Sequence, residues 1–211
     1  MKKNLFTVLF LSTLSISFFS CKEKAKEAAT TEAEQVIETP SGVSYTTNLS
    51  ASTIEWKGYK PTGSHYGTID IKEGDLSLVD SKISGGSFVI DMTSLKDAEG
   101  SAKLEGHLKS ADFFEVETYP TSTFEITSLK NENGKTMLSG NLTLKGTTNN
   151  VTFPVSVTHE GETLTLVSDM FTIDRSKWNV KYGSKSFFDD LGDKFINDDI
   201  ELKVTVKATK S

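Results

Sequence analysis

The three histidines are the residues best suited to hold a metal ion or to move a proton, but their spacing predicts neither role. His65, His107 and His159 lie far apart, without the short helical spacing or the paired cysteines of zinc sites. The chain also lacks the G-x-S-x-G turn that exposes a catalytic serine. We therefore expect no metal site, no cofactor and no catalytic residue, and we expect that the protein is not an enzyme.

Cys21 is the only cysteine of the chain, and it directly follows a leader-like segment. Lys2 and Lys3 precede a stretch of about 15 residues rich in apolar side chains, which is too short for a stable membrane-spanning helix. The small residue Ser20 stands before the cysteine, and the arrangement resembles a bacterial lipoprotein signal. We expect residues 1–20 to be a lipoprotein signal peptide and Cys21 to carry the lipid anchor. The protein is then exported to the cell envelope, at the outer membrane or the periplasmic side.

Aromatic and apolar side chains are the remaining candidates for a binding role, because the chain holds 13 phenylalanines. Contacts of this kind hold apolar ligands, with a few polar groups for orientation. Each residue taken singly is better explained as ordinary core, and only the set as a whole suggests a cavity. The candidate ligand-binding residues are Trp56, Phe88, Ile90, Phe113, Phe114, Phe124, Ile126, Leu142, Phe153, Phe171 and Trp178.

The elements that position these side chains are predicted to be strands, because apolar and polar residues alternate from about residue 45 onward. Residues 151–157 and 200–208 are clear examples. Short turn signals separate neighbouring runs, which predicts antiparallel pairing. Eight to ten strands with one apolar face each can bury that face by closing into a barrel. We predict an all-β fold, interrupted by one or two short helices within about residues 103–112.

The remaining segments define the organisation of the chain. Residues 21–43 carry mixed charges and almost no large apolar side chain, so we expect a flexible tether there. Residues 44–211 are then one domain. The aromatic-rich residues 177–199 are expected to cover the core as a lid. The formal net charge of −6 argues against nucleic acid as a partner, because phosphate binding requires a basic surface.

Several local strings resemble the YceI-like family of polyisoprenoid-binding proteins. They are residues 53–58 with Gly63, His65 and Gly67, residues 107–114, 119–124, 140–147, 151–155 and 174–178, and the closing strand 199–208. The resemblance spans about residues 45–208. It implies a single extended, lipocalin-like antiparallel barrel of eight strands around an apolar tunnel that binds isoprenoid chains, including quinone tails. It carries over no catalytic residue.

The resemblance leads to an expected function. The partner is an isoprenoid or similar long apolar lipid chain, a quinone-type ligand included, held for storage or transport at the cell envelope. The membrane is expected as a second partner through the N-terminal acyl anchor. The sequence is also compatible with a homodimer. The alternative is a barrel filled by its own side chains, acting as a structural or stress-related surface lipoprotein without ligand. An unrecognised hydrolase is a third and weaker alternative.

Overall fold

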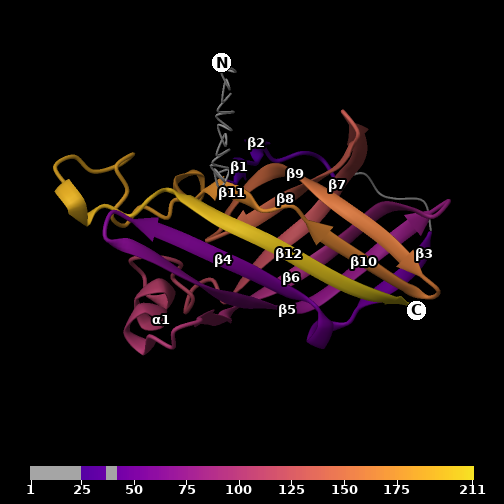
Figure 1. Cartoon of the computed structure of the whole chain (residues 1–211), viewed down its shortest axis with the longest axis horizontal. Helices are drawn as coiled ribbons and strands as arrows, with labels where there is room; N and C mark the ends of the chain where they lie inside the picture. The colour runs from indigo at the N-terminus through magenta and orange to yellow at the C-terminus, as the bar shows by residue number, and fades with distance from the viewer. Residues whose placement is uncertain (1–24, 37–41) are drawn as a thin grey trace, which may run out of the picture.

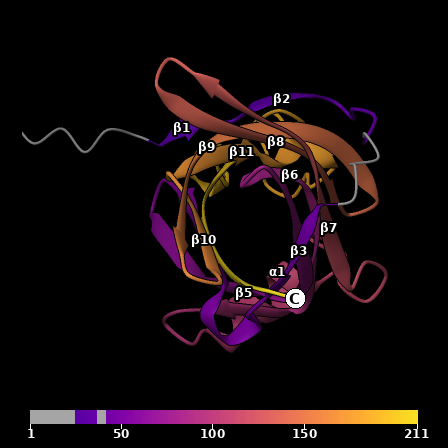
Figure 2. The ribbon, with the colours of Figure 1, turned by 90° about the vertical axis from the view of Figure 1, so that its right-hand side faces the viewer.

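The computed structural model describes residues 25–36 and 42–211. Within them, eight strands follow one another around a closed ring of antiparallel neighbours, which Figure 2 shows from one end. The ring consists of β4 (Thr53–Lys60), β5 (Gly63–Val79), β6 (Lys82–Asp97), β7 (Thr121–Glu132), β8 (Lys135–Leu144), β9 (Thr147–Glu160), β10 (Thr163–Ser168) and β12 (Asp199–Lys210). The predicted all-β barrel of eight strands is therefore confirmed.

Shorter elements complete the two ends of the barrel. At one end, β3 (Val43–Thr47) pairs with β5 and β12, and η1 (Leu49–Ala51) leads from it into β4. At the other end lie α1 (Ala102–Lys109) and the long loop after β11 (Phe171–Asp174), as Figure 1 shows. This loop contains η2 (Arg175–Trp178) and η3 (Gly192–Lys194). The helix ends before the predicted boundary at residue 112, because Ser110 already has an extended backbone.

The N-terminal segment differs from the expected flexible tether, because residues 26–32 belong to the sheet. β1 (Lys26–Glu27) pairs in parallel with β11, and β2 (Ala29–Glu32) pairs antiparallel with β9. β10 pairs with β9 only along residues 155–160, so β2 takes the part of that edge that β10 leaves free. We call residues 26–32 the seam segment, because they connect β9 and β11. Strand addition uses backbone N–H and C=O groups, which hydrophobic patterning does not reveal.

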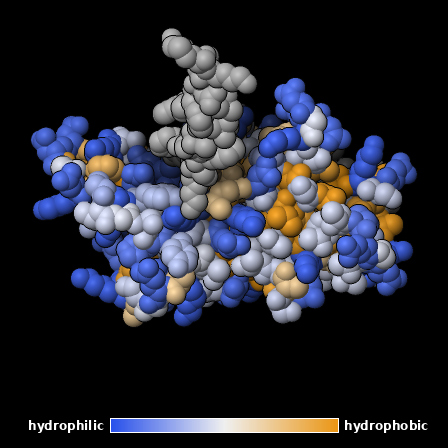
Figure 3. Space-filling model, viewed as in Figure 1, coloured by the Kyte–Doolittle hydropathy of each residue, from blue (hydrophilic) through white to orange (hydrophobic). Residues whose placement is uncertain are grey.

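The loop after β11 only partly matches the expected lid. Trp178 is fully buried, but the side chains of Phe187 and Phe188 are 43% and 49% exposed. These two phenylalanines therefore do not cover the core. The outer surface is mostly polar on the face drawn in Figure 3, with apolar residues showing over β9 and β10. No helix of the described residues is long and apolar enough to cross a membrane.

Candidate functional site

A cavity of about 310 Å³ lies inside the barrel. Side chains from every strand of the ring contribute to its wall, together with α1 and the loop after β11. Most of the lining is aliphatic or aromatic. The volume lies near the lower limit of cavities that bind small molecules, which span about 300–1,000 Å³. The barrel is therefore not completely filled by its own side chains.

The structure brings most of the predicted ligand-binding residues together on this wall. Trp56, Phe88, Ile90, Phe113, Phe114, Phe124, Leu142, Phe153 and Phe171 line the cavity. Ile126 and Trp178 are buried but do not line it. Ile126 lies on β7 opposite Gly140, two residues past Phe124, and is buried at 4% exposure. The indole Nε1 of Trp178 donates to the carbonyl oxygen of Leu142 at 2.9 Å, so this ring packs on the backbone of β8.

Four aromatic rings form one connected part of the wall. Phe88 on β6 lies directly opposite Phe124 on β7. The Phe124 and Phe153 ring centroids are 5.8 Å apart, and Phe153 stacks on Phe171 with 4.2 Å between centroids. Gly140 makes room for this arrangement, because a Cβ atom there would lie 2.3 Å from Cζ of Phe124. The glycine thus sets the position of a cavity-facing ring on the neighbouring strand.

The segment after α1 supplies the aromatic side chains at the helical end of the cavity. Phe113 and Phe114 are both buried, with their rings edge to face and 5.0 Å between centroids. The backbone holds them in place, since Phe114 N donates to Leu108 O at 3.1 Å and Lys145 Nζ donates to Phe113 O at 3.0 Å. Both residues therefore line the cavity from fixed positions.

Arg175 is a buried charged residue on the wall, and no candidate site predicted from the sequence includes it. Its guanidinium donates to the carbonyl oxygens of Tyr182 at 2.9 Å and Ile196 at 3.1 Å, and lies 5.0 Å from the Phe113 ring centroid. Burial lowers the pKa of Arg175, while the nearby carboxylates, above all that of Asp198 at 3.3 Å, act to raise it. Because its donors bind backbone carbonyls, Arg175 holds the loop after β11 in shape. The string around Arg175 was recognisable only through the family resemblance.

Polar and partly exposed side chains mark the mouth of the cavity. The side chains of His65 and His107 line the cavity and are each 33% exposed. At the opposite end, the lining residues Leu138 and Val206 are almost completely buried. The cavity therefore opens at the end that carries α1, and a ligand with one polar end would place that end beside the two imidazoles.

Comparison with known proteins places this barrel in a family. The family model of the YceI-like domain matches residues 45–208. The chain belongs to the YceI-like domain family. Among curated proteins, none matches this YceI-like chain. The seam segment lies outside the matched residues.

Solved structures share the fold of this YceI-like protein. Burkholderia cenocepacia BcnA is 24% identical, with a TM-score of 0.64 over 77% of this chain and 99% of that one. A polyisoprenoid binding domain from Saccharophagus degradans, implicated in plant cell wall breakdown, is 14% identical, with a TM-score of 0.59 over 80% and 99% of the two chains. The YceI protein of Campylobacter jejuni is 15% identical, with a TM-score of 0.50 over 96% and 99%.

The predicted signal peptide, residues 1–20, and the predicted lipid attachment at Cys21 lie outside the described residues. They stay predictions, as do the export of the protein and its place at the cell envelope.

Proposed function

We propose that this protein binds an isoprenoid or similar long apolar lipid chain in the barrel cavity. The observation that carries the proposal is the cavity itself, which is open at one end and walled by aliphatic and aromatic side chains. Each methylene group of a ligand that leaves water for such a wall contributes about 0.8 kcal/mol. The Saccharophagus relative, described as a polyisoprenoid binding domain, supports this class of ligand.

The mouth favours a ligand with one polar end. His65 and His107 stand where the cavity reaches solvent, and the deeper wall is apolar. An isoprenoid tail would enter first, and its head group, a quinone ring among the candidates, would stay near the imidazoles. Binding requires no covalent step, so the proposed role is that of a carrier and not of an enzyme.

The cavity also weighs against the filled-barrel alternative. Protein interiors are close-packed and seldom contain voids larger than a water molecule. A barrel that served only as a structural scaffold would gain stability by filling a space of about 310 Å³ with larger side chains. The unfilled volume therefore supports a ligand.

The experiment that tests the proposal is displacement of a fluorescent polyprenyl analogue, combined with native mass spectrometry of the purified protein and extraction of any bound lipid. Phe124→Ala removes a ring from the wall and should weaken binding at least tenfold, or about 1.4 kcal/mol. Phe188→Ala is the matched control, because this phenylalanine is exposed and lies off the cavity. If no polyprenyl or quinone lipid binds saturably, and Phe124→Ala costs the full ~3–5 kcal/mol of a filled core, the filled barrel replaces our proposal.

We further propose that the protein stores or transports this lipid as an envelope lipoprotein anchored through Cys21. The lone cysteine after a basic and apolar leader supports the anchor. Two or three acyl chains would hold the protein stably at a membrane, where one chain alone is marginal. Cys21→Ala should leave the leader uncleaved or the protein soluble, as seen by membrane fractionation and by intact mass. Quantitatively soluble wild-type protein with Met1 still present would contradict the anchor.

A further inference from the structure

A cluster of three potential metal ligands lies beside the cavity mouth. It consists of His65 near the start of β5, Asp97 at the end of β6, and Glu99 in the turn before α1. One ligand atom from each residue lies within 4.8 Å of the other two. Spacing along the sequence conceals this cluster, because the strand pairing of β5 and β6 brings the residues together.

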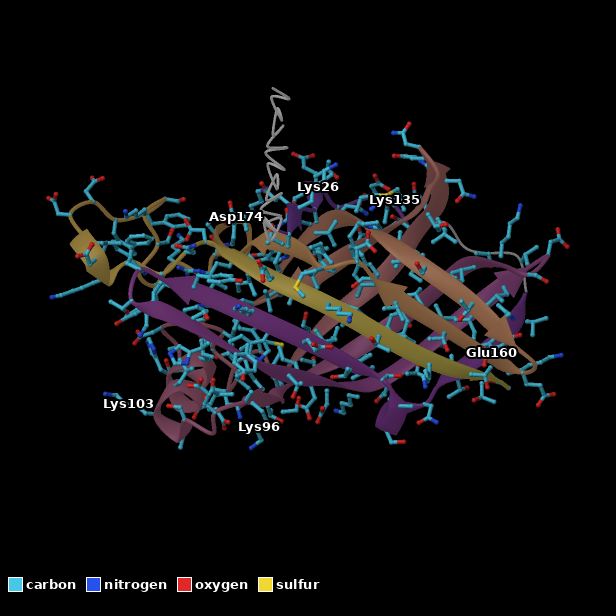
Figure 4. The ribbon with its side chains drawn as sticks, viewed as in Figure 1. Lys26, Lys96, Lys103, Lys135, Glu160 and Asp174 are labelled. Carbon is cyan, nitrogen blue, oxygen red and sulfur yellow. The ribbon has the colours of Figure 1, made fainter. Side chains whose placement is uncertain are left out.

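The backbone explains why these side chains meet. Asp97 pairs with Gly67, and His65 lies two residues before Gly67 on β5. His65 and Asp97 therefore face the same side of the sheet. Gly67 allows a very close approach of the two strands, because a Cβ atom there would lie 1.8 Å from the carbonyl oxygen of Lys96. Figure 4 shows Lys96, the neighbour of Asp97, at the same end of the barrel as Lys103 of α1.

The decisive observation is that two buried polar atoms in this cluster have no hydrogen-bond partner. They are Oδ1 of Asp97 and Nδ1 of His65. The side chain of Asp97 is 0% exposed, so its carboxylate has lost the water that would otherwise solvate it. A buried carboxylate oxygen without a partner carries a large desolvation cost, which a cation would remove.

The distance between these two atoms is too long for a hydrogen bond but close to that between two ligands of one metal ion. His65 Nδ1 and Asp97 Oδ1 are 3.7 Å apart, which is too far for a hydrogen bond. Two ligands on one tetrahedral zinc ion, each bonded at about 2.0–2.2 Å, stand roughly 3.4 Å apart. The observed separation therefore fits two ligands of one ion after a shift of a few tenths of an ångström.

The remaining oxygen of Asp97 is held as metal ligands usually are. Oδ2 accepts a hydrogen bond from the backbone N–H of Ser101 at 3.0 Å. Such a bond from outside the ligand set orients a coordinating carboxylate. It leaves Oδ1 as the free atom that points toward His65.

We propose that Nδ1 of His65, Oδ1 of Asp97 and a carboxylate oxygen of Glu99 bind a divalent transition-metal ion of the zinc class. One imidazole nitrogen with two carboxylate oxygens is a donor set that zinc accepts, and a water molecule would complete a tetrahedron. Because His65 also lines the cavity, the ion would lie at the wall of the mouth. The expectation of no metal site, which rested on sequence spacing, is replaced by this proposal.

Zinc alone, added to the metal-free protein, tests the site. Isothermal titration should give one zinc ion per chain, and zinc at a hundred times its dissociation constant should raise the unfolding temperature by about 5–10 °C. Cobalt substituted for zinc should give the visible absorption bands of a tetrahedral nitrogen–oxygen site. EDTA should reverse the rise in unfolding temperature and abolish the cobalt absorption bands.

Variants locate the ion. Asp97→Asn and His65→Gln should each weaken zinc binding by at least about a hundredfold, since loss of outer-shell partners alone costs ten- to a hundredfold. His159→Gln is the matched control, because that imidazole packs against Tyr45 and belongs to no such cluster among the described residues. If Asp97→Asn fails to fold, His65→Gln decides. Wild-type protein that binds no zinc saturably, or binds it unchanged in both variants, would overturn the proposal and leave His65 and Asp97 as a simple ion pair.

Discussion

The ring of Phe153 lies face to face with that of Phe171, with 4.2 Å between the centroids and 3° between the planes. Phe153 belongs to β9 and Phe171 to β11, two strands that are not paired with each other among the described residues. The seam segment connects the same two strands through backbone hydrogen bonds. The stacking of Phe153 on Phe171 and the pairing of the seam segment therefore both connect β9 with β11, which do not pair directly.

Phe171→Ala should weaken both the seam and the ligand site. In a filled core this change costs ~3–5 kcal/mol, but one side of the ring faces the cavity, so we expect about 2–3 kcal/mol. Urea unfolding measures the loss, and polyprenyl displacement should show weaker binding. Phe187→Ala, on an exposed side chain, should stay within about 0.5 kcal/mol of wild type. Equal losses in the two variants would contradict the role of the stack.

Gly140→Ala should narrow the cavity, because the added methyl group would displace the neighbouring Phe124 ring. The new methyl group would meet the cavity-lining Phe124 ring and the carbonyl oxygen of Glu125 on β7. We expect weaker ligand binding with a stability loss of about 1–3 kcal/mol from overpacking. Gly106→Ala is the control, because nothing lies within 4 Å of that position and alanine favours the helix by up to ~1 kcal/mol. Unchanged affinity in Gly140→Ala would show that the ring does not touch the ligand.

Asn141→Ala should loosen the N-terminal segment. The Asn141 side chain accepts from Glu34 N at 2.9 Å and donates to Glu34 O at 2.6 Å, as a neighbouring strand would. Its loss should cost about 1–3 kcal/mol, because the buried Asn150 amide, which also donates to Asn141 Oδ1, loses this acceptor. Hydrogen exchange at the Ala28 amide, which bonds to Thr172 O, should accelerate. Asn149→Ala, which removes one exposed bond to Lys177 O, should leave that exchange nearly unchanged.

Arg175→Met should unfold the loop after β11. The substitution keeps most of the apolar stem but leaves several buried carbonyl oxygens without their donor, and removes the guanidinium from Oδ1 of Asp198. We expect a loss of about 3–5 kcal/mol, measured by chemical unfolding, and faster proteolysis within residues 179–198. Arg175→Lys keeps the charge but not the planar set of donors, and should fall between methionine and wild type. A methionine variant as stable as wild type would refute this role.

The alternation of apolar residues predicted the barrel and the face of each strand, but not which inward-facing residues line the cavity. Phe124 and Ile126 share one face of β7, and both are largely removed from solvent, yet only Phe124 reaches the cavity. The period of two fixes the side to which a residue points. Which inward-facing residue reaches the cavity depends on packing between neighbouring strands, such as the close approach of the Phe124 ring to Gly140.

Irregular segments were the hardest to predict. The size and aromatic ring of Trp178 predict a place on the cavity wall, but its indole N–H donates to the backbone of β8 and holds the ring elsewhere. No sequence pattern predicts a buried Arg175, because a charged residue is seldom fully buried. Its hydrogen-bond acceptors are backbone carbonyls, which the pattern of side chains along the sequence does not reveal.

The pairing of the seam segment also limits how far the barrel can stand from a membrane. If Cys21 carries the proposed anchor, five residue steps separate it from Lys26, and a fully extended chain spans at most about 18 Å over that length. A free chain through residue 43 would have reached several times farther. β1 lies along the flank of the barrel in Figure 1. The short segment between Cys21 and Lys26 would therefore attach the barrel to the membrane through its flank. The start of β1 would then stay within about 18 Å of the lipid anchor.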